Sequence, residues 1–265
     1  MLGEIYNTLL VNPIFNALML FNLITGNLTF AIIGLTILIK GISIPLIAPS
    51  LKSVKKQREL QPQLDKVRQK YKYDKQKQAE MQMKLLKEHG INPASGCYSM
   101  IITIIIFTAL YSVIRQIIVI NDVAVLNSHL YANFLRINSL TDLDTTFLYL
   151  DLTKPDPYYI LAVLLGTMQF LFAKMSMPYS AAGVEAAKKT PDKKDDFAYN
   201  MQQQSLYIMP VFMVMLGATM PAGVAIYLIA STLFSIIQNY FINGLGGLQP
   251  LFERIYGKRE NTRTS

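Results

Sequence analysis

The segment from Leu28 to Pro49 reads LTFAIIGLTILIKGISIPLIAP and carries a single charged residue, Lys40. A helix of roughly 20 apolar residues is long enough to cross the ~30 Å hydrocarbon core of a bilayer. The whole chain of 265 residues is 52% hydrophobic and only 16% charged, which is unusual for a soluble globular protein. The segment therefore predicts a transmembrane helix in an integral membrane protein.

Apolar runs of similar character recur four times along the chain. They are Ser99–Ile114, Tyr158–Ala173, Leu206–Met220 and Val224–Ile242. A kink is expected at Pro210, which lacks a backbone donor, and Pro221-Ala222-Gly223 predicts a tight turn between the last two runs. The predicted fold class is an all-α integral membrane protein, a five-transmembrane-helix bundle with an N-terminal interfacial helix and a cytoplasmic helical hairpin.

The N-terminal stretch differs from these runs. Its apolar run, Ile14 to Ile24, is interrupted by Asn16 and Asn22 and is shorter than a bilayer requires. No Lys or Arg precedes Lys40, so a cleavable signal peptide is not expected. We expect an amphipathic helix at the membrane surface, with a first span as the open alternative.

The positive charges set the predicted topology. Twelve Lys or Arg lie between Leu51 and Gly90, five between Lys174 and Ser205 and four after Gly247, which makes 21 of the 25 in the chain. The stretch from Gln116 to Pro157 has two cations and five aspartates. Because cytoplasmic loops are rich in Lys and Arg, the N-terminus is predicted outside and the C-terminus in the cytoplasm.

These observations divide the chain into nine predicted parts. They are an extracytoplasmic interfacial helix (1–27), transmembrane helix 1 (28–50), a basic cytoplasmic helical hairpin (51–91), transmembrane helix 2 (92–120), an extracytoplasmic loop (121–157), transmembrane helix 3 (158–177), a cytoplasmic loop (178–205), transmembrane helices 4 and 5 (206–243) and a basic cytoplasmic tail (244–265).

The predicted hairpin is amphipathic. Apolar residues recur at Leu60, Leu64, Val67 and Tyr71, on one face of a charged helix. A second helix is expected to start after Asp74, as N-cap, and to end at Gly90. Its apolar side chains pack between the two helices in one interpretation. In the other, an adaptable surface binds apolar segments of other proteins, because methionine conforms to varied shapes. The candidate contact residues of this hairpin, for clients or other proteins, are Leu60, Leu64, Met81, Met83 and Leu85.

Lys40 lies about 14 Å inside the first span at helical rise. A charge at this depth costs about 3 kcal/mol on insertion scales, so it is expected to face protein or water. Thr36 and Ser43 share its face of the helix. A hydrated pocket open to the cytoplasm is predicted, with snorkelling of Lys40 as the alternative.

Other spans carry polar residues that could line the same pocket. They are Gln169, Ser231, Ser235 and Gln238. Each could equally form hydrogen bonds that hold helices together.

No motif for covalent chemistry is found in the sequence. Cys97 is the only cysteine, so an intrachain disulfide or a cysteine metal site is excluded. We expect no metal, no cofactor and no enzyme activity. Membrane orientation and anionic lipids account for the net charge of +8 without sequence-specific nucleic-acid binding.

Several strings resemble the YidC/Oxa1/Alb3 family of membrane protein insertases. They are Thr36-Ile-Leu-Ile-Lys40-Gly-Ile-Ser-Ile-Pro45-Leu46, Arg58-Glu-Leu-Gln-Pro62, Lys70-Tyr-Lys72 and Lys84-Leu-Leu-Lys-Glu-His-Gly-Ile-Asn-Pro93, followed by Gly96-Cys97. The resemblance covers nearly the whole chain and is to the short bacterial form.

The resemblance implies an insertase and chaperone of the bacterial cytoplasmic membrane. A hydrophilic groove, open to the cytoplasm and lipid, would draw in the tails of newly made membrane proteins, with Lys40 as its cation and Gln169 in its wall. Family members typically have Arg at this position, so Lys40 favours attraction of negative tails over bidentate pairing. The Sec translocon and the ribosome are further candidate partners.

Two other classes stay open on the residues alone. A small proton-coupled transporter would use an intramembrane Lys but usually shows an internal repeat, which the sequence lacks. A membrane scaffold would use the hairpin as a binding arm and need no buried charge.

Overall fold

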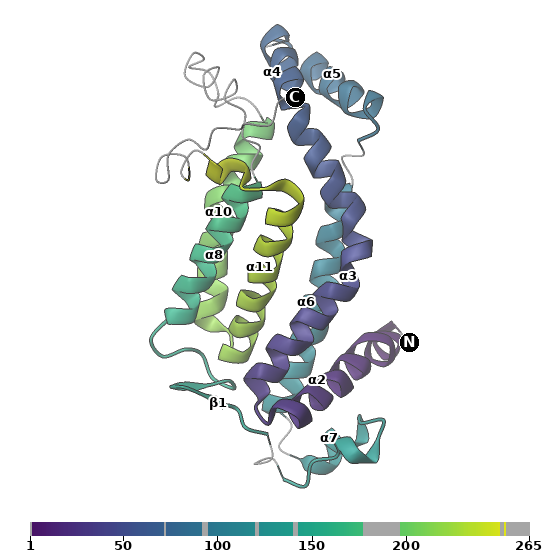
Figure 1. The fold of residues 1–265 in the computed structure, drawn as a ribbon, viewed down its shortest axis with the longest axis vertical. Coiled ribbons are helices and arrows are strands. Elements are labelled where there is room, and N and C mark those ends of the chain that lie inside the picture. Colours follow the sequence, from purple (N-terminus) through teal and green to yellow (C-terminus); the bar gives the residue numbers. More distant parts are fainter. Residues whose placement is uncertain are drawn as a thin grey trace, which may run out of the picture. The chain divides into compact units, whose positions relative to one another are not determined.

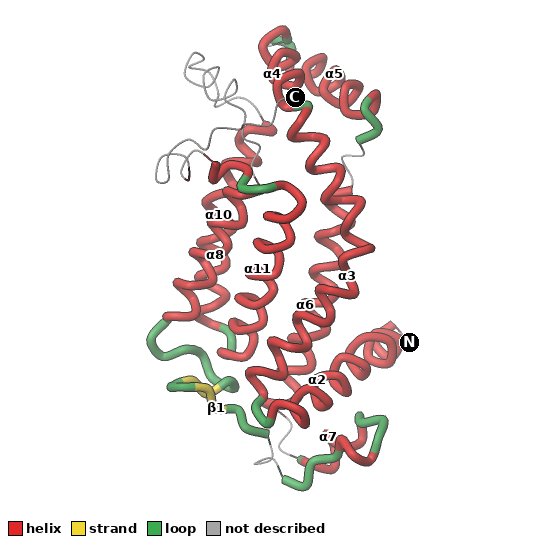
Figure 2. Tube along the Cα trace, viewed as in Figure 1, coloured by secondary structure: helices red, strands yellow, loops and turns green. Residues whose placement is uncertain are grey.

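The structure is a computed structural model that describes residues 2–71, 73–91, 95–119, 122–139, 143–176, 197–249 and 252. Helices predominate in it (Figures 1 and 2). The described elements are α1 (Leu2–Tyr6), η1 (Asn7–Val11), α2 (Asn12–Thr25), α3 (Leu28–Glu59), α4 (Gln61–Lys70), α5 (Lys75–Glu88), α6 (Ser95–Val119), α7 (Val123–Ser128), η2 (Asn133–Leu135), β1 (Thr146–Phe147), β2 (Leu150–Asp151), α8 (Ile160–Ser176), α10 (Phe197–Thr219), α11 (Ala222–Asn243) and η5 (Gly246–Leu248).

The described helices include stretches of membrane-spanning length. Gly3–Thr25, Leu28–Gln57 and Ala222–Ile242 are long and apolar enough to cross a membrane. Shorter apolar helices cover Ile101–Ile117, Ile160–Ser176 and Leu206–Thr219. The structure therefore agrees with the predicted all-α membrane protein class.

The chain divides into two compact units, and several helices contribute to both. The first unit comprises Met1–Leu46, Cys97–Met168 and Pro210–Phe234, and the second comprises Ile47–Gly96, Gln169–Met209 and Ser235–Ser265. Each unit is described separately.

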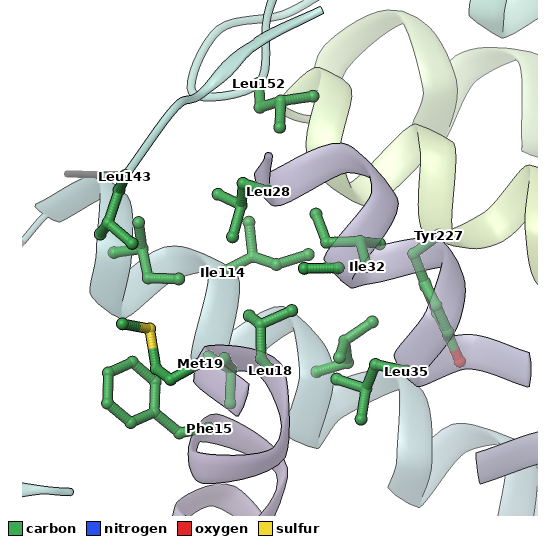
Figure 3. Close-up of a cluster of buried hydrophobic side chains, with 14 of the residues drawn as sticks. Phe15, Leu18, Met19, Leu28, Ile32, Leu35, Ile114, Leu143, Leu152 and Tyr227 are labelled. Carbon is green, nitrogen blue, oxygen red and sulfur yellow. The ribbon is translucent and has the colours of Figure 1, made fainter. Parts of the chain in front are cut away.

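A large apolar core holds the first unit together. Phe15, Leu18 and Met19 of α2 lie against Leu28, Ile32 and Leu35 of α3 and Ile114 of α6 (Figure 3). Tyr227 of α11 and the loop residues Leu143 and Leu152 complete the labelled part of this cluster. The core thus joins the N-terminal helix, the beginnings of α3 and α11 and the end of α6.

The N-terminal helix is longer than its apolar run suggested. Helical structure is continuous from Leu2 to Thr25, through the π-helical segment η1, and ends at Gly26, whose φ of 69° favours glycine. The stretch Gly3–Thr25 is long and apolar enough to span a bilayer. Length therefore does not separate a surface helix from a span.

Helix α3 does not end at residue 50, the predicted boundary between the first span and the hairpin. Helix α3 continues through Pro45 and Pro49 to Glu59. The break comes at Leu60, and α4 begins with Pro62 in its first turn, where proline is favoured because no helical donor is lost. Asp74 caps α5 as predicted, accepting a hydrogen bond of 3.0 Å from the Lys77 amide.

A small separate cluster packs α4 against α5 in the second unit. Leu60 and Leu64 meet Leu86 and Ile91, and Leu85 lies beside them. The two helices have 10 and 14 residues, and the N-terminal part of the predicted hairpin, residues 51–59, belongs to α3 instead.

The predicted extracytoplasmic loop contains ordered structure. Between α6 and α8 lie α7, η2 and the antiparallel pair β1 and β2 (Figure 2). Phe147 of β1 is paired with Leu150 of β2. The predicted loop 178–205 is partly helical, since α10 begins at Phe197. Helix α10 continues through Pro210, and α10 and α11 meet at the predicted turn. Residues 177–196 and most of the basic tail lie outside the described residues.

Candidate functional site around Lys40

Helix α3 changes the character of its buried face along its length. Near its start the buried residues are Leu28, Ala31, Ile32 and Leu35, together with Thr29. Further along, the buried residues are polar: Thr36, Ser43 and Ser50, which are 1%, 4% and 6% exposed. These three repeat every seven residues and so lie on one face, as predicted for Thr36 and Ser43.

Local hydrogen bonds explain how the two hydroxyls tolerate burial. Thr36 Oγ1 donates to the carbonyl oxygen of Ile32 over 2.6 Å, and Ser43 Oγ donates to that of Ile39 over 2.7 Å. A hydroxyl bonded to the preceding turn keeps acceptor capacity for a further donor such as water. The polar face of α3 is therefore able to line a cavity that contains water.

The exposed side chains in this part of α3 are apolar. Ile37, Leu38, Ile42, Ile44 and Leu46 are all exposed large hydrophobic residues. Apolar side chains outside and polar ones inside are the reverse of a water-soluble helix, and they are expected where lipid is the surrounding solvent.

Lys40 lies between Thr36 and Ser43 and is half-buried. Its ammonium group is a compact positive charge on a flexible stem. A half-buried lysine among hydroxyls is the arrangement that an intramembrane cation requires, since lipid solvates a charge poorly. The structure thus places Lys40 on the polar stretch of α3.

Helix α11 shows the same change from apolar to polar. Its first turns bury Ala222, Val224 and Tyr227, and farther along it buries Ser231 and Asn239. Ser231, Ser235 and Asn239 are spaced by four residues and form one row.

Asn239 was missed by the sequence analysis. Its side chain is 4% exposed, and its Nδ2 donates to Ser176 Oγ of α8 over 3.3 Å. The four-residue spacing from Ser235 could have identified it. Gln238, which was selected instead, is half-buried, and its Nε2 has no hydrogen-bond partner among the described residues.

The seven predicted groove residues belong to different units. Thr36, Lys40, Ser43 and Ser231 are in the first, and Gln169, Ser235 and Gln238 are in the second. Gln169 is half-buried on α8. Their convergence on one groove stays a prediction.

The five candidate client-contacting residues differ in how exposed their side chains are. Leu60 and Leu64 are 7% and 3% exposed and pack between α4 and α5. Met81 and Leu85 are half-buried, and Met83 is exposed. Lys70 and Lys77 both approach the ring of Tyr71, at 5.5 and 5.9 Å.

Metal-binding clusters are absent from the part of the chain that the structure describes: no three His, Cys, Asp or Glu side chains gather there. The polar stretches instead consist of hydroxyls, amides and one amine.

Comparison with known proteins identifies relatives over most of the chain. The model of the family described as 60Kd inner membrane protein matches residues 19–246. A protein of Fusobacterium nucleatum named Membrane protein insertase YidC is 34% identical over 218 residues, covering 82% of this chain and 86% of that protein.

Longer relatives carry the same name. The one from Aquifex aeolicus is 34% identical over 234 residues, which cover 88% of this chain and 39% of that protein. The one from Geobacter sulfurreducens is 29% identical over 235 residues, which cover 89% and 37%. The chain thus spans most of one relative and less than two fifths of the other two.

Proposed function

This chain belongs to the family of the 60Kd inner membrane protein, and from that premise we propose that it is a membrane protein insertase of the bacterial cytoplasmic membrane. The observation that carries the proposal is that the buried residues of α3 change from apolar to polar along the helix, while its exposed residues between Phe30 and Pro49 stay apolar. A helix of this kind can face water on its polar side and lipid on its apolar side, so that one client can contact both.

In the proposed mechanism, the polar stretch of α3 lines a hydrophilic groove open to the cytoplasm. Polar groups of a client tail stay hydrated in such a groove, which avoids the several kcal/mol that each unsatisfied group costs in hydrocarbon. The positive charge of Lys40 attracts acidic tails. The apolar segment of the client then slides out along the exposed apolar side of the helices, and no covalent step is needed.

The large apolar core supports closure of this groove on the outer side. Its members lie at the beginnings of α3 and α11 and in the connection between α6 and α8. In the proposed topology these ends face away from the cytoplasm. A dry core there would prevent ion leakage while the polar stretches admit water from the other side.

The proposed topology has five spans, α3, α6, α8, α10 and α11, with the N-terminus outside. The distribution of 21 of the 25 cations supports it. Asn16 of α2 is hydrogen-bonded to the backbone of His129 and Tyr131 in the α6–α8 connection. A polar connecting segment is not stable in hydrocarbon, so this contact favours α2 at the membrane surface.

Helices α4 and α5 are proposed to receive clients first. Met83, exposed on α5, offers the adaptable contact, whereas Leu60 and Leu64 hold the two helices together. The basic character of residues 51–90 supports attraction to anionic lipid, and the Sec translocon and the ribosome are proposed as further partners.

Insertion into vesicles tests this function. A single-span client with one acidic residue in its short N-terminal tail is added to vesicles that contain only this protein, and protease protection of the tail is measured. The proposal predicts protection above that in empty vesicles, and more for the acidic tail than for a neutral one. Equal protection with and without the protein would contradict it.

A further inference from the structure

Exposed aromatic and apolar side chains gather at one end of the first unit. We call Phe30, Phe147, Leu148, Tyr149, Tyr158 and Tyr159 the aromatic rim. Phe147 is half-buried and the other five are exposed, with Leu148 at 86%. Two ring contacts connect its parts: Phe30 with Phe147 at 5.9 Å, and Tyr149 with Tyr158 at 5.3 Å.

Hydrogen bonds fix the rim to the beginnings of three helices. At α3, the Leu28 amide donates to the Asp144 carbonyl oxygen over 3.0 Å. At α11, the Gly223 amide donates to the Leu152 carbonyl oxygen over 3.0 Å. At α8, the Leu161 amide donates to Asp156 Oδ2 over 2.8 Å. The rim is therefore held at a set height relative to α3, α8 and α11.

The tip of the rim is unusual for a turn in water. Leu148 has a φ of 57°, in the left-handed region. Gly, Asn and Asp are the common residues in that conformation because they avoid strain and interact well with water. A strained leucine at the most exposed position of a hairpin suggests that the environment of this tip is not water.

The rim continues into a surface that faces lipid in the proposed fold. Tyr158 and Tyr159 are followed by Ile160, Val163 and Leu164 of α8, all exposed. Tyrosine is enriched where membrane helices meet the headgroups, because its ring is apolar and its hydroxyl is polar. Three of the six rim residues are tyrosines, and two of them, Tyr158 and Tyr159, directly precede α8.

We propose that the aromatic rim is a docking surface for phospholipid, with Leu148 and its flanking rings entering the headgroup region of the bilayer. Since the rim is hydrogen-bonded to α3, α8 and α11, its docking would fix the depth of these helices in the membrane. This role is independent of client insertion, and its test requires no client.

The chain has no tryptophan, so a single introduced indole reports on one place. Leu148→Trp and Tyr158→Trp are made separately at the rim, so that one remains informative if the other does not fold. Lys154→Trp is the matched control: it lies in the same anchored segment, and its side chain is 76% exposed. Each variant is placed in phosphatidylcholine and phosphatidylglycerol vesicles, with and without bromine near the carbonyl end of the acyl chains.

Phospholipid docking predicts that the rim tryptophans emit at shorter wavelength than the control and lose most of their intensity to brominated lipid. Equal quenching at the rim and at Lys154→Trp would overturn the proposal, since it would show only that the whole connection lies near the membrane. Short-wavelength emission without quenching would also overturn it and would indicate contact with a second protein copy. Long-wavelength emission at both rim positions would show a rim in water.

Discussion

The backbone amide of Tyr131 donates a hydrogen bond of 2.7 Å to Oδ1 of Asn16, a residue 115 positions earlier in the chain. Asn16 Nδ2 donates in turn to the carbonyl oxygen of His129 over 2.9 Å, and the ring of Phe15 meets that of His129 edge-on. One buried amide thus joins the N-terminal helix to the connection between α6 and α8.

Replacing Asn16 by Leu would make α2 more apolar yet destabilise the protein. Two partly buried backbone groups would lose their partner, at up to about 1–3 kcal/mol for each group that water cannot reach. Unfolding in detergent and hydrogen exchange at the Tyr131 amide measure the effect. Asn7→Leu, at an exposed position of the same helix, is the control and should leave both unchanged. Equal effects of the two substitutions would contradict the role of Asn16.

Gly217 allows α10 to approach α8 closely. A Cβ atom at this position would lie 2.9 Å from the Ala162 Cα atom, which belongs to the backbone and cannot turn aside. Gly217→Ala should therefore lower the free energy of unfolding by about 1–3 kcal/mol, as overpacking does.

Gly41 offers a matched comparison within a helix, since a Cβ there meets nothing within 4 Å. Gly41→Ala should be neutral or stabilise by about 0.4–1 kcal/mol. A Gly217→Ala protein as stable as the Gly41→Ala protein would show that α8 and α10 are not tightly packed at this point.

The carboxylate of Asp144 should remain charged to low pH. The Thr146 hydroxyl and amide and the Asn27 amide donate to it, and these hydrogen bonds hold the pKa of Asp144 below its usual value. A lowered pKa in the folded state stabilises the fold above the unfolded pKa of about 3.9, and that contribution is lost as pH falls through the folded value.

The Thr146 amide resonance in nanodiscs should accordingly stay constant from pH 8 to pH 5 and shift only below about pH 4. Asp144→Asn should abolish the shift. A transition near neutral pH would be inconsistent with the observed hydrogen bonds.

Met83 and Leu64 should respond differently as candidate client contacts. A photoreactive residue in place of Met83, which is exposed, should crosslink to a client that is still being synthesised. One in place of Leu64 should not, because Leu64 is buried between α4 and α5. Leu64→Ala should instead loosen α4 and α5, measured by protease sensitivity. Strong crosslinking from Leu64 with none from Met83 would show that these two helices open to receive clients.

Periodicity was sufficient to predict the polar face of α3. Thr36 and Ser43 are seven residues apart, and the structure buries both. Spacing did not predict that α3 continues through Pro45 and Pro49 to Glu59, which is possible because membrane helices tolerate proline. The break instead precedes Pro62, which is favourable in the first turn of α4.

Long-range partners could not be predicted in the same way. Asp144-Thr145-Thr146 and Asp151-Leu152-Thr153 repeat a local pattern in which an aspartate accepts from the residue two positions on. That pattern predicts turns. It does not reveal that Asp144 meets Asn27 across 117 residues, because spacing carries no information on which distant helix end lies nearby.

The charge of Lys40 is the central feature of the proposed mechanism, and substituting it tests the account most directly. Insertion of the acidic-tailed client is compared for Lys40→Ala, Lys40→Arg and the control Lys174→Ala, a cation near the end of α8 that lies over the Phe170 ring. The account predicts that Lys40→Ala loses protection of the tail while Lys40→Arg and Lys174→Ala retain it. Full insertion by a folded Lys40→Ala protein would contradict a positively charged groove.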